Sequence, residues 1–372
     1  MRQLAALFSW SGNPVHLVGF GDQGTREIAG LDARVATTTL PNRVTWFQRQ
    51  VLGALGQNGS FSARRALVRF VRGLLTTGQP GARGLLLYNQ DPWLSMRLAD
   101  VCKAARIPFL QQYAELHVAQ DFRARWLQGY FLREQMHMRL APRRADGNLV
   151  ISSWLRDRVE LEGGRNILRL PAFVDVDFWD AAIGLAPNRR VPGRIVYVGE
   201  GARRDCLETI IAAAALSRKW SPKIELRLVG LSGKRGRALR NHEGVITMPR
   251  LNHAELACEY SAAAATILLR SDDQSSRACF PTRLGEMLLG GAPVILSDMP
   301  DYNLEFVHGL NAYLVNPSDL QGIARCMVAA TSGDEENDRI GAAGRLVART
   351  RLNPKCHLAA VAQWLDRACG KP

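Results

Sequence analysis

Short apolar runs alternate with helical segments through the second half of the chain, and this alternation is the strongest constraint on the fold. The runs are rich in Val, Ile and Leu, and a longer segment with helical periodicity follows each of them. Because parallel strands need a crossover connection that is usually a helix, the pattern predicts a doubly wound, parallel α/β sheet. The expected strands are at 195–198, 224–229, 244–248 and 266–270, and a further apolar strand, with Pro293 at its entry, follows Gly291.

The length of the chain fits two domains of this kind. A chain of 372 residues is longer than one compact core usually holds. No apolar run of about 18 residues or more occurs, so no membrane-spanning helix is expected. The seven Cys form no C-x-x-C pair and fit reduced, cytoplasmic thiols. The expected division is an N-terminal domain at 1–180, a linker at 181–192, a C-terminal domain at 193–353 and a terminal helix at 354–372 that packs back towards the N-terminal domain.

The stretch from Phe280 to Asp298, FPTRLGEMLLGGAPVILSD, contains polar groups that could bind a phosphate. It predicts a cationic loop, a short helix, a stop at two glycines and an apolar strand. Thr282 is expected to cap the helix, so that the N–H groups of the first turn and the Arg283 guanidinium face one space. Glu286, one turn further along, is placed to accept the hydroxyls of a ribose. The local residues alone fit an ordinary loop–helix–strand unit equally well.

This stretch resembles the signature of the GT-B glycosyltransferases, in particular the retaining enzymes of glycosyltransferase family four. The resemblance implies two Rossmann-like domains with parallel sheets that face a cleft, and it assigns to Glu286 the binding of the ribose of a sugar nucleotide. The family often carries another Glu with seven residues between the two, and Ala278 stands at that position here. The resemblance extends from about residue 83 to the end of the chain and is closest over 195–331.

The resemblance also implies donor-binding residues outside this helix. In the family, a Gly after the first strand of the C-terminal domain is followed by an Arg and a Lys that bind the diphosphate. Arg203 and Arg204 are the nearest matches, although the Lys is missing and the spacing is compressed. Arg203 is also expected to act in catalysis. The full expected donor-binding set is Gly199, Gly201, Arg203, Arg204, Pro249, Leu251, Phe280, Pro281, Thr282, Arg283, Leu284 and Glu286.

The N-terminal half is expected to carry the acceptor side. The strand at 107–113 ends just before Glu115 and His117, and ligands of α/β sheets bind outside the carboxyl ends of strands. Glu115 best matches a catalytic acceptor-side residue of the family, and His117 fits a catalytic or a structural role equally well. The chain opens as a helix at 2–10 and a strand at 15–20. The first strand and Gly-rich loop of a GT-B domain are therefore not found, which predicts a late start codon or an incomplete domain.

The formal net charge of +14 predicts attraction to polyanions. Basic amphipathic helices are expected at 44–54, at 62–77 and within 122–144, where Glu134 is the single acid among six Arg. Several such helices in one domain favour an anionic membrane surface as partner. Nucleic acid is the competing partner, but no zinc-finger or RNP-type motif accompanies the charge, so none is expected to bind.

The leading hypothesis is a cytoplasmic glycosyltransferase, peripheral on the inner face of the membrane. It would transfer a sugar from a nucleotide-sugar donor to a cell-surface glycan or lipid-linked acceptor. The resemblance implies hexosyl transfer with retention of configuration, without a metal or other cofactor. The main alternative is an inactive relative that binds a nucleotide sugar or scaffolds polysaccharide assembly. A sugar-nucleotide epimerase of the same architecture is a further alternative.

Overall fold

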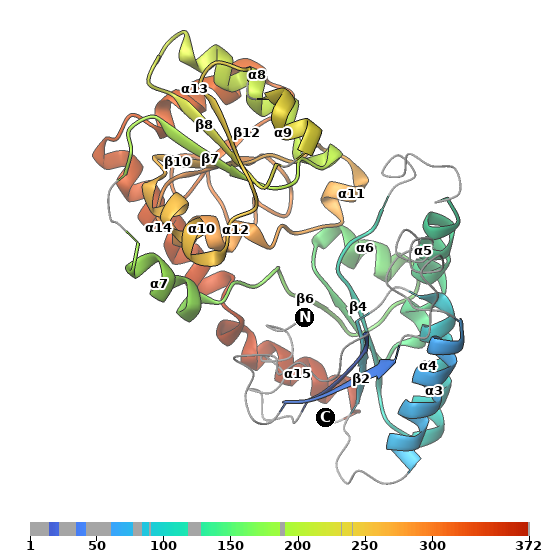
Figure 1. The fold of residues 1–372 in the computed structure, drawn as a ribbon. Coiled ribbons are helices and arrows are strands. Elements are labelled where there is room, and N and C mark those ends of the chain that lie inside the picture. Colours follow the sequence, from blue (N-terminus) through green and yellow to red (C-terminus); the bar gives the residue numbers. More distant parts are fainter. Residues whose placement is uncertain are drawn as a thin grey trace. The chain divides into compact units, whose positions relative to one another are not determined.

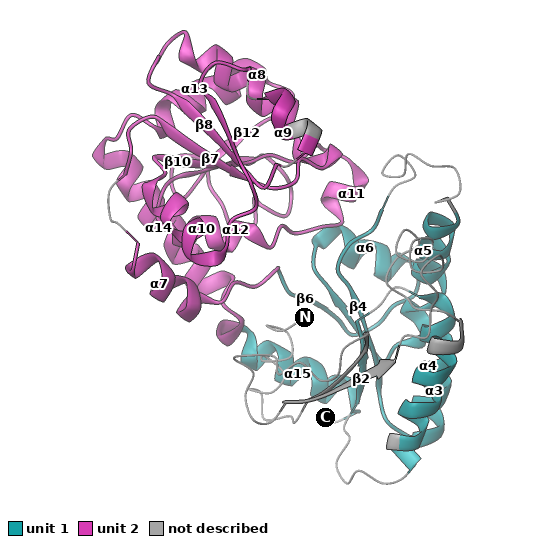
Figure 2. Ribbon diagram, viewed as in Figure 1, with its two compact units in different colours: residues 1–171, 357–372 teal, residues 172–356 magenta. Residues whose placement is uncertain are grey.

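The computed structural model describes residues 15–21, 35–41, 61–76, 84–88, 91–117, 128–186, 190–231, 233–239 and 241–370. The chain forms two compact units, which Figure 2 distinguishes by colour. Unit 1 comprises residues 1–171 and 357–372, and unit 2 comprises residues 172–356. The linker expected at 181–192 begins inside helix α7 (Val176–Gly184), which belongs to unit 2. The helices expected at 2–10 and 44–54 lie outside the described residues.

Unit 2 contains a six-stranded sheet in which every pairing is parallel. The strand order is β12-β11-β10-β7-β8-β9. The chain therefore runs outward from β7 to β8 and β9, then returns to the other side of β7 with β10, β11 and β12. Such a reversal of strand order marks the place where open α/β sheets bind ligands. The strands are β7 (Arg194–Val198), β8 (Glu225–Val229), β9 (Val245–Met248), β10 (Ala265–Leu268), β11 (Val294–Ser297) and β12 (Tyr313–Val315).

Helices cover both faces of this sheet, with α8 and α13 on one side and α10, α12 and α14 on the other (Figure 1). Covering on both faces explains why β10 and β11 are mostly apolar and fully buried. The helices of unit 2 after α7 are α8 (Leu207–Arg218), α9 (Gly233–Leu239), α10 (His253–Ala262), α11 (Gln274–Arg277), α12 (Arg283–Leu289), α13 (Leu320–Ala330) and α14 (Glu335–Arg351), with a short 3₁₀ turn, η4 (Arg203–Asp205).

Unit 1 contains a four-stranded parallel sheet of order β3-β4-β5-β6 and a two-stranded parallel sheet, β1 (Val15–Gly21) with β2 (Val35–Pro41). The predicted fold class, two α/β domains with parallel sheets, is confirmed. None of the described helices is long and apolar enough to span a membrane. The remaining elements are β3 (Leu85–Leu87), β4 (Phe109–Tyr113), β5 (Gly147–Val150), β6 (Ile167–Arg169), α3 (Phe61–Thr76), α4 (Pro92–Ala105), α5 (Gln128–Leu140), α6 (Ser153–Leu161) and α15 (Leu358–Ala368).

Helix α15 returns to unit 1 and packs against β5 and β6. Its Trp364 is fully buried, and the indole donates a hydrogen bond of 2.7 Å to the carbonyl of Asn166. The Asn166 side chain donates in return to the carbonyl of Trp364 at 3.1 Å. Gly147 at the start of β5 leaves room for the ring, since a Cβ there would lie 2.9 Å from Trp364 Cζ2.

Trp364→Ala is expected to destabilise unit 1 by about 3–5 kcal/mol, because it leaves a large cavity. It also removes one of the two hydrogen bonds that the Asn166 carbonyl accepts, the other coming from the Asn148 amide. The free energy of opening is measured by hydrogen exchange of the β5 and β6 amides in a urea series. The control is Gln363→Ala, on the exposed side of the same helix. An effect of Trp364→Ala no larger than that of the control would contradict this packing.

Candidate functional site

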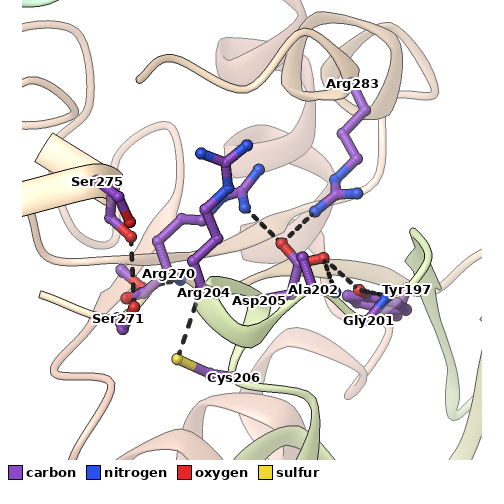
Figure 3. Close-up of polar contacts among 12 residues, drawn as sticks. Tyr197, Gly201, Ala202, Arg204, Asp205, Cys206, Arg270, Ser271, Ser275 and Arg283 are labelled. Carbon is purple, nitrogen blue, oxygen red and sulfur yellow. Dashed lines mark hydrogen bonds and ion pairs between the residues drawn. The ribbon is translucent and has the colours of Figure 1, made fainter. Parts of the chain in front are cut away.

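The reversal of strand order in unit 2 brings charged residues together at the carboxyl ends of β7 and β10. Gly199 directly follows β7, Arg270 follows β10, and Arg283 begins α12. The guanidinium groups of Arg270 and Arg283 both contact one carboxylate oxygen of Asp205, at 2.9 Å for Arg283. Asp205 ends η4, so residues far apart in the sequence meet at one carboxylate (Figure 3).

The second carboxylate oxygen of Asp205 is also bound. It accepts hydrogen bonds from the Tyr197 hydroxyl at 2.9 Å and from the Ala202 amide at 3.1 Å. Burial by itself would raise the pKa of Asp205, but Arg270, Arg283 and these two donors hold it below its ordinary value. Asp205 is therefore an ionised, buried carboxylate that fixes two arginine side chains. We call Asp205, Arg270 and Arg283 the arginine clamp.

The arginine clamp holds two positive charges against one negative charge. Arg270 is almost fully buried, and Arg283 is about one-fifth exposed. Arg283 also lies over the ring of Tyr197, with its guanidinium carbon 5.6 Å from the ring centroid. A positive charge held in place by buried partners suits an anion that arrives from solvent, because the cationic groups need little reorganisation.

Two glycines, Gly199 and Gly201, lie beside the arginine clamp at positions that favour glycine. A side chain at Gly199 would collide with the Arg283 guanidinium and would place its Cβ 2.6 Å from the Tyr197 hydroxyl. Gly201 adopts φ +66°, in the left-handed region that favours glycine, and its amide donates to the Tyr197 hydroxyl at 3.2 Å. Both residues were predicted from the sequence, and the structure places both beside Tyr197, with Gly199 also beside Arg283.

The structure places Arg203 and Arg204 differently from each other. Arg203 forms an ion pair with Asp273 at 3.0 Å, on the exposed side of η4. Asp273 caps α11 and is bound by nearby Ser side chains; burial opposes its ionisation, but these hydrogen bonds lower its pKa to about 2. The Arg204 side chain extends to the same side of η4 as the guanidinium groups of Arg270 and Arg283 (Figure 3). The catalytic role of Arg203 stays a prediction.

Thr282 stands at the N-cap position of α12, as predicted, but its side chain does not cap the helix. Thr282 precedes the helix, but its backbone is helical, at φ −62° and ψ −35°, and its side chain makes no capping hydrogen bond. A side-chain cap needs an extended backbone at that position. The predicted residues Phe280, Pro281 and Leu284 are buried, and Phe280 packs edge-on against Tyr302. These three side chains therefore hold α12 in place.

Glu286 lies on α12, one turn after Arg283. Burial raises the pKa of Glu286 to about 7, against the opposing effects of Arg283 and the Tyr260 hydroxyl. Near neutral pH this carboxyl is therefore close to half protonated. Ala278, where the resembled family often has a second Glu, is fully buried at the end of α11. No carboxylate stands at that position.

The turn with Pro249 and Leu251 joins β9 to α10, at the same sheet edge as Gly199. The amide of Gly230, just after β8, donates to the carbonyl of Pro249 at 3.3 Å. Asn252 and Glu255 form a capping box that starts α10 directly after the turn. The turn is therefore fixed at both ends and leaves Pro249 exposed.

The acceptor-side residues predicted in unit 1 follow β4, and His117 is held by a buried carboxylate. The His117 amide donates to Glu134 at 2.9 Å, and its ring Nδ1 lies 3.2 Å from the same carboxylate. This pairing favours the tautomer with the proton on Nδ1 and makes Nε2 the acceptor. The charge of Glu115 helps to raise the pKa of Tyr88 and of Tyr130, after burial, so Glu115 lies near both rings.

The sequence did not reveal Asp205, Arg270, Tyr197 or Glu134 as site residues. Arg270 carried a signal: it is a charged residue two positions after a mostly apolar strand, and ligands of α/β sheets bind outside the carboxyl ends of the strands. The role of Asp205 depends on contacts with residues 65 and 78 positions further along the chain. No local pattern marks such contacts.

Comparisons with known proteins agree with this geometry. The family described as glycosyl transferases group 1 matches residues 192–332. Residues 192–332, which lie within unit 2, therefore match a group 1 glycosyltransferase domain, and the chain has the GT-B fold. The resemblance and the fold predicted from the sequence are confirmed. No curated protein matches the chain by sequence.

Solved structures resemble the GT-B chain over nearly its whole length. Sucrose-phosphate synthase from Thermosynechococcus elongatus is 20% identical, with a TM-score of 0.69 over 97% of this chain and 90% of that one. Trehalose 6-phosphate synthase from Burkholderia multivorans is 13% identical, with a TM-score of 0.67 over 99% and 92%. HepE from Anabaena, solved with UDP, is 14% identical, with a TM-score of 0.65 over 95% and 99%. At these identities the likeness shows the fold.

Asp205→Asn is expected to cost about 3–5 kcal/mol of unfolding free energy, because it leaves two arginines without their carboxylate. Folding lowers the pKa of Asp205. The parent should therefore be more stable than the variant by the full amount above the ordinary carboxyl pKa, and this difference in unfolding free energy should disappear as the pH falls through the lowered pKa. Urea unfolding measures both effects. The control is Asp272→Asn, which breaks an exposed pair with Arg277. Equal costs for the two variants would refute the clamp.

Glu286→Gln is expected to stabilise the unliganded protein more as the pH rises. The pKa of Glu286 in the folded protein, about 7, lies above its ordinary value. Ionisation of Glu286 at higher pH therefore destabilises the folded parent, whereas a Gln at this position does not ionise. Between about pH 5 and pH 8 the difference between variant and parent should shift by about 1–3 kcal/mol towards the variant. Urea unfolding across this range tests it, with the exposed Glu335→Gln on α14 as control. A difference independent of pH would be inconsistent with the raised pKa.

Proposed function

We propose that the protein is a glycosyltransferase that passes a hexose from a nucleotide-sugar donor to a cell-surface glycan or lipid-linked acceptor. The arginine clamp beside Gly199 is the observation that carries the proposal. It puts excess positive charge at the strand-order reversal of a group 1 glycosyltransferase domain. The HepE structures solved with UDP, and with UDP-glucose, support a nucleotide diphosphate as the group that leaves.

The clamp suits the charge that develops during transfer. As the bond from sugar to diphosphate breaks, negative charge grows on the leaving phosphate oxygens. Arg283 and Arg270 would stabilise that charge, and Gly199 and Gly201 would let the phosphate approach the backbone closely. Arg203 would add cationic charge at the outer side of η4, and Arg204 would add it on the side of the Arg270 and Arg283 guanidinium groups. We propose that these guanidinium groups supply the positive charge for transfer without a metal.

Glu286 is proposed to bind the ribose of the donor. An ionised carboxylate accepts hydrogen bonds from two hydroxyls, whereas the protonated form accepts less well. With a pKa of about 7, Glu286 would lose its proton when the donor binds. Donor affinity should therefore fall as the pH drops below neutrality. Because residue 278 is Ala, the protein has no carboxylate at this position to bind the sugar of the donor.

On the acceptor side, His117 and Glu115 are proposed to receive the acceptor hydroxyl. With Glu134 holding the Nδ1 proton, His117 Nε2 can accept a proton from a hydroxyl that attacks the sugar. Retention of configuration is proposed from the resemblance to the retaining family. A cytoplasmic location against an anionic membrane surface is part of the same proposal.

A nucleotide-sugar-binding protein without transfer activity is the second candidate. Two observations favour it: Ala278 replaces a carboxylate, and Arg203 is paired with Asp273. This candidate would bind UDP and depend on the clamp, but it would not turn the donor over. Release of UDP from UDP-glucose by the full chain therefore separates it from an enzyme.

Arg283→Ala is expected to lower donor turnover about 10²–10³-fold, because it removes charge stabilisation at the leaving group. Turnover is measured as nucleotide release from UDP-glucose and from other nucleotide hexoses, with and without candidate acceptors. Arg283→Lys should retain part of the rate, since it keeps the charge and loses the fork of two N–H groups.

Arg277→Ala is the control, because Arg277 is exposed and paired with Asp272 outside the clamp. The proposal fails if Arg283→Ala and Glu286→Ala both leave turnover at the parent level. It also fails if the folded parent binds UDP and turns over none of the nucleotide hexoses with any acceptor supplied.

A further inference from the structure

Helix α5 buries two polar side chains and exposes three apolar ones. Glu134 and His137 are buried in unit 1. Leu132, Met136 and Leu140 are exposed by 60%, 53% and 38% of their surface. Residues four positions apart share one face of a helix, so these three side chains form a continuous apolar stripe. A surface helix of a soluble domain normally has the opposite arrangement.

Hydrogen bonds fix this orientation. Glu134 binds the backbone and ring of His117, and His137 Nδ1 lies 3.2 Å from the Ser95 hydroxyl. Burial lowers the pKa of His137 to about 3, so the ring is neutral on the buried face. Turning the helix to bury its apolar stripe would break these contacts and expose Met138. The stripe is therefore held towards solvent.

The charges around the stripe are positive. Arg139 is exposed on α5, and Arg143 and Arg144 are exposed in the turn that follows it. The acids that these last two meet, Glu162 at 3.9 Å and Asp100 at 3.3 Å, form weak surface pairs. Glu134 is the only acid within α5, and it is buried and held by His117. Among the residues of α5 whose burial is described, the exposed side chains, at Leu132, Met136, Arg139 and Leu140, are therefore apolar or cationic.

We infer that the stripe of Leu132, Met136 and Leu140, with Arg139, Arg143 and Arg144, docks on an anionic lipid surface. The apolar side chains enter the boundary between headgroups and acyl chains, and the arginines meet the headgroup phosphates. The cationic border favours this occupant over an apolar protein surface, as does the formal net charge of +14. The inference rests on the membrane location within the proposed function and assigns it to one helix face.

Co-sedimentation of the full chain with lipid vesicles tests the inference. The vesicles are pure phosphatidylcholine, or phosphatidylcholine mixed with phosphatidylglycerol. The parent should bind the mixed vesicles and lose binding in high salt. Leu132→Gln combined with Met136→Gln should weaken binding about tenfold or more, because both side chains leave the interface. Arg139→Gln should weaken binding about fivefold.

Leu185→Gln is the matched control, since Leu185 is an exposed leucine of unit 2. The inference is overturned if the α5 variants bind vesicles as the parent does. It is also overturned if they abolish self-association of the chain and leave vesicle binding unchanged, which would make the stripe a contact between copies. Nucleotide release from UDP-glucose without vesicles is measured in parallel. If the parent chain binds the mixed vesicles but releases no nucleotide, the proposed transfer reaction is contradicted and the lipid-binding inference is not.

Discussion

The buried carboxylate of Asp205 is the interaction on which the candidate site depends. It binds Arg270 after β10, Arg283 at the start of α12 and Tyr197 at the end of β7. The strand-order reversal brings these elements to one sheet edge. The Asp205 carboxylate then fixes the positions of the two guanidinium groups. Two buried arginines without this anion would repel each other and lose solvation. The same contact therefore stabilises unit 2 and leaves one positive charge for a ligand.

Much of the fold and part of the site followed from the sequence. Strands such as β10 and β11 are buried on both faces, so their apolar runs were visible without any partner. Arg283 and Glu286 were found because one helical turn and its spacing determine their position. Asp205 and Arg270 were not found, because their roles arise only when distant segments meet. The Thr282 cap failed because the sequence does not report the backbone angles at that position.

The site of unit 2 also shows features that oppose stability. Glu286 is buried with a raised pKa, and the left-handed backbone at Gly201 requires a glycine. Well-packed apolar groups at these places would favour folding and would remove the polar groups that meet a ligand. Such features are expected at functional sites, where residues needed for binding or catalysis are retained although they lower stability. The buried hydrophobic cluster around β7, β8 and β10 contributes to stability in the opposite direction.

Helix α5 links the two roles proposed for unit 1. Its buried face holds His117 through Glu134, and its exposed face carries Met136 only two residues further on. Since a helix with its side chains is about 10–12 Å across, the Glu134 carboxylate that holds His117 and the apolar stripe lie on two faces of one helix of that width. A lipid-linked acceptor has its reactive sugar just outside the headgroups. A helix that rests on the membrane while its inner face orients His117 would therefore bring this acceptor to the residues proposed to receive it.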